Sequence, residues 1–264
     1  MCRTFFYTIL LLDCSIPFNQ STAQDKSVTK HEVIEVQVPE VPDRGPYPDL
    51  KKVGPLVVEK TNTFRKEQVR KPVSTNAKLT ETAQEFANFM AKEDKYGHTA
   101  DGKQPAERAK KQGYEYCIVL ENIAYAFDST GFDVEKLATQ FEKGWENSPG
   151  HRKNMLDPDI SETGVAIARS EKTGHYYAVQ LFGRLKSEAI DFAVENKTKE
   201  TIEYTLGDQA FSLQPRYTRT HTICRPEDLK FQWPDKQTPD TTLKPGAKDR
   251  FTITKDETGF RVKK

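Results

Sequence analysis

Three residues of this 264-residue chain have side chains that could support chemistry at one site: His98, Glu121 and His151. Two imidazoles and one carboxylate can coordinate a divalent ion such as zinc and leave a position open for water. Such an ion can polarise a carbonyl group or lower the pKa of its bound water. The three residues lie far apart in the sequence and do not form a local His-Glu-x-x-His pattern. The three residues can therefore form one site only if the fold brings them together.

A structural role is the alternative interpretation of the same residues. The imidazoles can hydrogen-bond to neighbouring backbone, and a buried Glu121 can accept hydrogen bonds that tie loops together. Near the second histidine, Arg152 and Asn154 are interpreted as loop anchors. The basic run over 108–111 is interpreted as one solvated helix face. Two further histidines are expected to lie in solvent, His175 and His221.

The region that must position these residues, 56–186, mixes helical and strand patterns. Apolar residues recur at helical spacing in several stretches, and two strand-like runs flank a turn signal. The predicted elements are a helical stretch from 57 that stops at Pro72, a helix over 79–90 with Asn76 as its N-cap, a short helix from Pro105 to Gly113, a helix over 134–145, and a hairpin of 164–169 with 176–182.

The residues from 187 to 264 follow a different pattern, in which apolar and polar residues alternate over short runs. Turn residues such as Gly207-Asp208 and Pro245-Gly246 separate these runs. Short strands at this spacing are typical of a small antiparallel sandwich or barrel. The sequence therefore predicts a second, all-β domain over 187–264.

The first residues, 1–23, have the pattern of a signal peptide. Arg3 precedes an apolar run over 5–12, and small residues allow cleavage before Gln24. A buried N-terminal helix is one alternative, and a lipoprotein attached through Cys14 is another. We expect an exported protein that has no transmembrane segment after cleavage.

The next residues, 24–55, are predicted to form an extended arm or linker. Pro39, Pro42, Pro46, Pro48 and Pro55 fall within this segment. Prolines at this density oppose both helices and central strands.

Removal of 1–23 would leave two of the four cysteines, Cys117 and Cys224. Their separation shows no metal-binding spacing. An exported chain permits one disulfide, but we expect Cys224 to be a buried thiol rather than a partner of Cys117. Cys117 is also conceivable as a nucleophile, although its apolar surroundings favour an inert thiol.

The overall composition excludes two classes of protein. The chain has 40 Lys and Arg against 39 Asp and Glu, a net charge of +1, which argues against a dedicated nucleic-acid binder. No apolar run reaches the roughly 18 to 20 residues that a membrane-spanning helix needs. A polytopic membrane protein is therefore excluded.

Four ordered motifs resemble the CAP superfamily, which contains cysteine-rich secretory proteins, antigen five and plant pathogenesis-related proteins. The resemblance covers 56–186 and is to the bacterial secreted branch, whose SCP domain has a Ser-Pro-Gly-His-Arg segment after a Trp. The motifs are Gly97-His98-Thr99 with Arg108, Glu121-Asn122-Ile123-Ala124, Trp145 with Ser148-Pro149-Gly150-His151-Arg152, and Gly164-Val165 with Tyr177 to Gly183.

The resemblance implies an α-β-α sandwich, so the expected fold class is α+β, with the small β domain following. It also implies a cavity lined by His98, Glu121 and His151, which can hold a divalent metal such as zinc. The family's second acidic position falls on Ser148 here, and Glu146 is the other candidate for that place. Glu146 would project from a different side of the helix.

Two functions from different classes follow. The first is an exported, non-catalytic protein that binds a small ligand, a lipid or a cell-wall or surface component. The second is a secreted hydrolase of the peptidase or amidase type, with His98, Glu121 and His151 as its catalytic or metal-binding groups. A structural adhesion role for the β domain is a third possibility.

Overall fold

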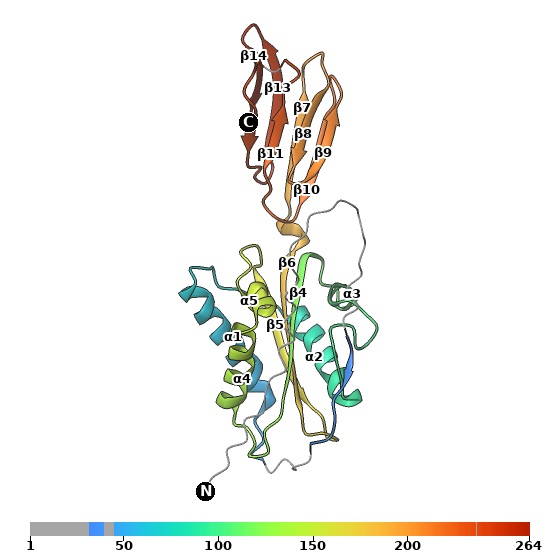
Figure 1. Ribbon diagram of the computed structural model, residues 1–264, viewed down its shortest axis with the longest axis vertical. Coiled ribbons are helices and arrows are strands. Elements are labelled where there is room, and N and C mark those ends of the chain that lie inside the picture. Colours follow the sequence, from blue (N-terminus) through green and yellow to red (C-terminus); the bar gives the residue numbers. More distant parts are fainter. Residues whose placement is uncertain (1–31, 40–44, 236) are drawn as a thin grey trace, which may run out of the picture. The chain divides into compact units, whose positions relative to one another are not determined.

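The computed structural model describes residues 32–39, 45–235 and 237–264 (Figure 1). The predicted signal peptide, Cys14 and the beginning of the predicted arm lie outside the described residues. The layered region before residue 187 contains β1 (Ile34–Glu35), α1 (Leu50–Glu67), β2 (Ser74–Thr75), α2 (Ala77–Glu93), β3 (Lys95–Tyr96), α3 (Pro105–Lys111), β4 (Tyr116–Ala126), α4 (Val134–Glu146), α5 (Pro149–Met155), β5 (Glu162–Arg169) and β6 (Tyr176–Leu185).

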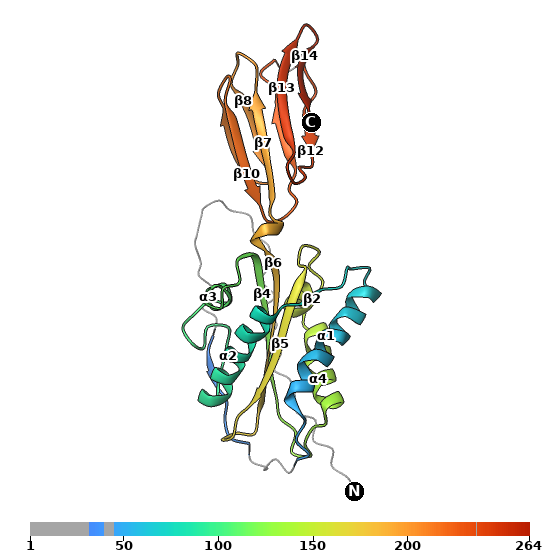
Figure 2. The same ribbon diagram turned by 180° about the vertical axis from the view of Figure 1, so that it is seen from behind.

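A four-stranded sheet in the order β2-β5-β6-β4 forms the middle layer. Helices α1 and α4 cover one face and α2 covers the other (Figure 2). Each face has its own apolar core, with Val57, Phe141 and Trp145 on the α1 and α4 side and Leu79, Phe86 and Met90 on the α2 side. This arrangement confirms the α+β class and the α-β-α sandwich.

Strand β4 is an edge strand, and it carries the candidate glutamate. Because side chains alternate along a strand, neighbouring residues face opposite layers. Leu120 packs with the α1 and α4 core, whereas Ile123 packs with the α2 core. Glu121 therefore faces the α2 side, and Asn122 faces the side of α4 and α5.

Two predicted helices have the expected end signals. The side chain of Asn76 accepts hydrogen bonds from the backbone N–H of Lys78 and of Leu79 at the start of α2. Pro105 begins α3, and Gly113 follows the helix with a φ of 75°.

Helix α1 corrects the prediction of an extended arm over 24–55. It begins at Leu50 and contains Pro55, so the proline does not prevent the helix. Val53 and Val57 are fully buried against the sheet, and this burial offsets the hydrogen bond that the proline removes. The helix ends at Glu67, before the predicted stop at Pro72.

The C-terminal β region consists of two four-stranded sheets, which confirms the predicted all-β pattern. One sheet has the order β10-β7-β13-β14 and the other β12-β11-β8-β9. All pairs are antiparallel except β7 with β13. After a short 3₁₀ turn (Lys186–Glu188), the strands are β7 (Ile190–Asn196), β8 (Ile202–Leu206), β9 (Gln209–Leu213), β10 (Thr218–Ile223), β11 (Leu229–Gln232), β12 (Thr241–Leu243), β13 (Arg250–Asp256) and β14 (Gly259–Lys263).

Cys117 and Cys224 form a disulfide, so the expectation of a buried Cys224 thiol is wrong. The bond joins β4 to the segment after β10. Arg225, the next residue, forms ion pairs with Asp157 at 2.8 Å and with Asp159 at 3.0 Å. A thiol nucleophile at Cys117 is excluded as long as this bond is intact.

Candidate functional site

Glu121 and His98 are in direct contact. The Nδ1 atom of His98 lies 2.8 Å from Oε1 of Glu121, and Nη2 of Arg108 donates to Oε2 of the same carboxylate at 2.8 Å. The Glu121 side chain is 1% exposed and that of His98 is 29% exposed. A carboxylate that already accepts from arginine is an acceptor for the imidazole too, so we assign the proton to Nδ1.

Arg108 fixes the loop that carries His98. Its Nη2 atom donates to the carbonyl of His98 at 3.0 Å, and its Nη1 atom donates to the carbonyl of Lys103 and to Oδ1 of Asp101. The guanidinium also lies 3.5 Å from the ring centroid of Phe86. Arg108 is 6% exposed, which corrects its interpretation as part of a solvated helix face. Lys110 and Lys111 are exposed, as expected.

His151 lies on α5, which is bonded to β4 through Asn122 and Asn154. The amide of Asn122 donates to the carbonyl of His151 at 3.2 Å. The amide of Asn154 donates to the carbonyl of Glu121 at 3.1 Å and to Oδ1 of Asn122 at 2.9 Å. These bonds tie the backbone of α5 to β4, and Asn154 acts as an anchor in the way the sequence indicated.

Burial is the main cause that lowers the pKa of His151, and the charge of His98 adds to it; the pKa falls to about 4. His151 is therefore neutral near pH 7. The structure thus brings His98 and Glu121 into contact and places His151 within electrostatic reach of His98.

Neither candidate for the fourth position joins this contact. Glu146 pairs with Lys143 and, at 4.0 Å, with Arg152 on the helix surface. Ser148 stands at the N-cap of α5 and makes no side-chain capping bond.

The side chains at this site differ from those of a three-ligand metal centre. Both oxygens of Glu121 are engaged by protein donors. In the part of the chain that the structure describes, no group of three His, Cys, Asp or Glu side chains is arranged to hold a metal ion. A three-ligand centre with Glu121 as a ligand does not fit this geometry, and His98 and His151 are the predicted ligands that remain.

Sequence reasoning missed the roles of Arg108 and Asn122. The Glu-Asn motif contained Asn122, but nothing in its spacing showed that its amide would bind the backbone of α5. For Arg108, the one available signal was the expectation of a buried carboxylate, which needs a cation nearby.

Two other histidines are buried, which corrects the expectation that they lie in solvent. His175 and His221 are each 9% exposed. The Nε2 atom of His221 lies 2.8 Å from the hydroxyl of Tyr204 in the C-terminal β region.

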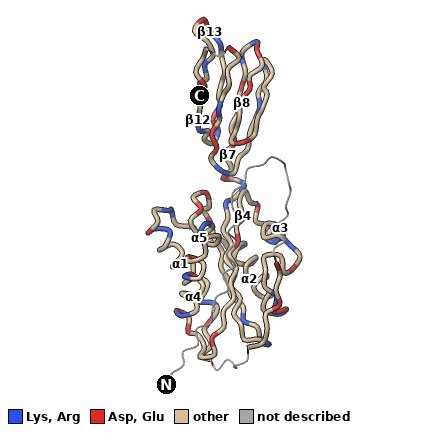
Figure 3. Tube along the Cα trace, in the orientation of Figure 1, with Lys and Arg blue, Asp and Glu red and all other residues tan. Residues whose placement is uncertain are grey.

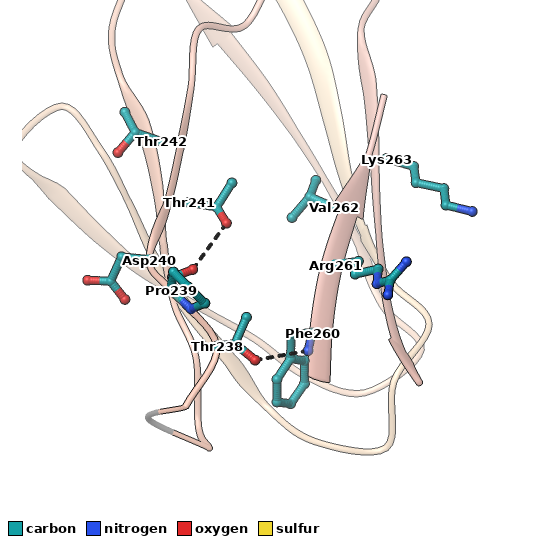
Figure 4. A pocket seen from close by; sticks show the side chains of 9 residues that line it. All are labelled: Thr238, Pro239, Asp240, Thr241, Thr242, Phe260, Arg261, Val262 and Lys263. Carbon is teal, nitrogen blue, oxygen red and sulfur yellow. Dashed lines mark hydrogen bonds between the residues drawn. The ribbon is translucent and has the colours of Figure 1, made fainter. Parts of the chain in front are cut away.

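A groove of about 640 Å³ lies in the C-terminal β region, between β12 and β14 (Figure 4). Its charged lining consists of Asp240, Arg261 and Lys263. None of the predicted site residues contributes to it, so the groove is separate from the chemistry at His98.

The region thus combines a three-layer sandwich with a buried Glu121 on an edge strand, a partly exposed His98 in contact with it and a second histidine on α5. Residues 58–182 match the model of the Cysteine-rich secretory protein family, CAP. This region is a CAP domain of that family.

Several known proteins are similar to the chain. Uncharacterized protein YkwD of Bacillus subtilis (strain 168) is 30% identical over 129 residues, which are 48% of this chain and 46% of the relative. The chain thus spans about half the length of this curated relative. Among solved structures, an outer surface protein from Borrelia burgdorferi has 20% identity and a TM-score of 0.43, over 50% of this chain and 92% of its own. An extracellular protein containing a SCP domain from Bacillus anthracis has 22% identity and a TM-score of 0.43, over 51% and 41%.

Within the described residues, no helix is long and apolar enough to cross a bilayer.

Proposed function

We propose that this chain is an exported CAP-domain protein that binds a polar component of the cell envelope at His98, Glu121 and His151 without turnover. The observation that carries the proposal is the state of Glu121. Its carboxylate is shielded from solvent, and both of its oxygens are bound to protein donors. A general base must reach the proton it abstracts, so Glu121 orients His98 instead, and the partly exposed imidazole contacts the ligand.

Two observations support export. The pattern of residues 1–23 is that of a signal peptide. The Cys117–Cys224 disulfide is typical of proteins that fold in an oxidising compartment. Attachment as a lipoprotein through Cys14 belongs to the same proposal as its alternative.

A secreted hydrolase is the second candidate, and the His98–Glu121 contact favours it. A carboxylate that holds an imidazole in one tautomer is the arrangement used by general-base histidines. A hydrolase would also need a nucleophile or an activated water. The disulfide removes Cys117 from that role, and therefore the binding function comes first.

Bound zinc remains a prediction of the family resemblance. Of the predicted ligands His98, Glu121 and His151, the two imidazoles are the ones left to hold it, because both oxygens of Glu121 are engaged by protein donors. Isothermal titration with zinc on the wild type and on His151→Ala tests it. Loss of the zinc signal in the variant is expected, and equal affinity in both proteins would contradict the prediction.

The binding function is tested with soluble muropeptides, released from peptidoglycan by lysozyme, in isothermal titration. We expect saturable binding to the wild type and at least about a tenfold loss in His98→Ala, because the partly exposed imidazole contacts the ligand. Lys103→Ala is the matched control on the same loop, since its side chain is exposed. Absence of binding, or equal affinity in His98→Ala and the wild type, would contradict the proposal.

A further inference from the structure

Val69 has a backbone conformation that does not suit its side chain. Its φ is 55°, in the left-handed region, where a β-branched residue is an outlier. The side chain is 89% exposed, so no packing interaction within the fold offsets the energetic cost of this conformation. Strained residues of this kind cluster at functional sites.

The strain arises from the way α1 ends. The N–H of Val69 donates to the carbonyl of Lys66 at 3.0 Å, and the N–H of Arg70 donates to the carbonyl of Arg65 at 2.8 Å. This pair of bonds is a Schellman motif, and the position that Val69 occupies in it is usually glycine. Glycine would therefore serve the fold better than valine.

Basic side chains surround this exposed valine. Lys66, Arg70 and Lys71 flank it along the chain and are exposed. Two bonds bring α5 beside them: Arg152 donates to Oε1 of Gln68 at 3.2 Å, and Arg70 donates to the carbonyl of Leu156 at 3.1 Å. We call the surface formed by Lys66, Val69, Arg70, Lys71, Arg152 and Lys153 the Val69 patch, and Figure 3 shows basic residues at the end of α1 and on α5.

The nearby acids neutralise little of this charge. Glu146 pairs with Arg152 and with Lys143, and the carboxylate of Asp157 is bound by Arg225. Glu67 is the acid within the same segment. In the described residues, no ion pair within 4 Å engages the basic groups of Lys66, Arg70, Lys71 or Lys153.

We infer that the Val69 patch binds an anionic phospholipid surface. An apolar side chain ringed by cations matches the boundary between lipid headgroups and acyl chains. A soluble anionic polymer would pair with the cations but would make no apolar contact with Val69. The inference concerns a surface outside the site of His98, and it does not depend on the proposed function of that site.

The test is flotation of the full chain with phosphatidylcholine vesicles that contain phosphatidylglycerol, compared with pure phosphatidylcholine. We expect binding to the anionic vesicles that weakens as salt is added. Lys66→Gln and Lys71→Gln should each lower the partition coefficient about fivefold. The apolar run at 5–12 is common to all variants, so the ratio between variants is the readout.

Val69→Gly is the decisive variant, because it should stabilise the fold and weaken vesicle binding at the same time. It should raise the urea midpoint of unfolding by relieving strain, and it should lower vesicle affinity about fivefold or more by removing the apolar contact. Val38→Gly, at another exposed valine, and Lys110→Gln are matched controls that should bind normally.

Equal vesicle binding by Val69→Gly and the wild type would overturn the inference. So would equal binding to anionic and neutral vesicles. Competition by soluble polyphosphate that is equally strong for the wild type and Val69→Gly would identify a polymer site instead. Saturable binding of an acidic peptide without vesicle binding would assign the patch to a protein partner.

Discussion

At the scale of single residues, Arg108 is the group on which the candidate site depends. It compensates the charge of Glu121, and it holds the loop of His98 through that residue's carbonyl. A buried carboxylate that loses its cation becomes an uncompensated charge, which is far more costly than a lost surface ion pair.

Arg108→Met should therefore lower the free energy of unfolding by about 3 to 5 kcal/mol, measured by urea denaturation. Lys110→Met, two residues along and exposed, is the control and should stay within about 0.5 kcal/mol of the wild type. Adding Glu121→Gln to Arg108→Met should recover part of the loss. A loss of under about 1 kcal/mol for Arg108→Met would contradict this role.

His221 gives a residue-level prediction about pH. Burial first, and the positive charge of Arg219 second, lower the pKa of His221. Below about pH 6.5 the unfolded chain takes up a proton that the folded chain does not, so stability falls as the pH falls.

The expected result is a lower urea midpoint at about pH 5 than at about pH 7.5, with a smaller difference in His221→Gln. Glutamine keeps a polar partner for the Tyr204 hydroxyl and does not titrate. An unchanged pH dependence in the variant would show that His221 does not contribute.

Much of the candidate site was predictable at this scale, but only through the resemblance of the sequence motifs to the CAP superfamily. Residue types identified His98 and Glu121 as chemically capable, and the structure joins them. The burial of Arg108 and of His221 was not predictable, because a single residue's burial depends on which layer covers it. Charge runs and isolated histidines carry no such information.

At the scale of elements, the sandwich depends on the close approach of β5 to α2. A Cβ atom on Gly164 would lie 2.2 Å from the backbone N of Thr80. The sheet and helix must therefore separate if this glycine gains a side chain. Gly144 in α4 offers the opposite case, since a Cβ there would meet nothing within 4 Å.

Gly164→Ala and Gly144→Ala should thus change stability in opposite directions. The first should lower the free energy of unfolding by about 1 to 3 kcal/mol. The second should raise it by about 0.5 to 1 kcal/mol, because alanine is the better helix former. Thermal and urea unfolding of the two variants measure this, and a stabilised Gly164→Ala would refute the close approach.

Element prediction succeeded where local signals and packing agree. For α2, helical periodicity and the Asn76 cap point to the same helix. For α1 they conflict, because Pro55 opposes a helix that Val53 and Val57 stabilise through burial. Local rules cannot weigh that burial, which depends on a sheet formed by residues far along the chain.

At the scale of the whole molecule, the Cys117–Cys224 bond joins segments 107 residues apart. Arg184 adds to this connection by donating to the carbonyl of Cys224 at 3.1 Å. Sequence alone left the pairing open, since only the fold shows whether two distant cysteines meet. The bond restricts the unfolded chain by closing a long loop.

Cys224→Ser in a Cys117→Ser background should lower the free energy of unfolding by about 2 to 4 kcal/mol relative to the oxidised wild type. The wild type in excess reductant should lose a similar amount, whereas the double variant should not respond to reductant. Thiol titration is done on the unreduced, denatured protein without residues 1–23, because that segment carries Cys2 and Cys14. Neither remaining cysteine should be free, and two free thiols there would contradict the bond.

Binding of an envelope component without turnover, at the site of His98 and Glu121, can be tested in a single experiment. The most direct measurement is mass spectrometry of muropeptides after prolonged incubation with the protein, in parallel with His98→Ala. If the site binds without turnover, every muropeptide is recovered at its original mass, and a column of immobilised wild type retains muropeptides whereas a column of His98→Ala does not. Cleaved products that form with the wild type and not with His98→Ala would contradict binding without turnover and establish a hydrolase.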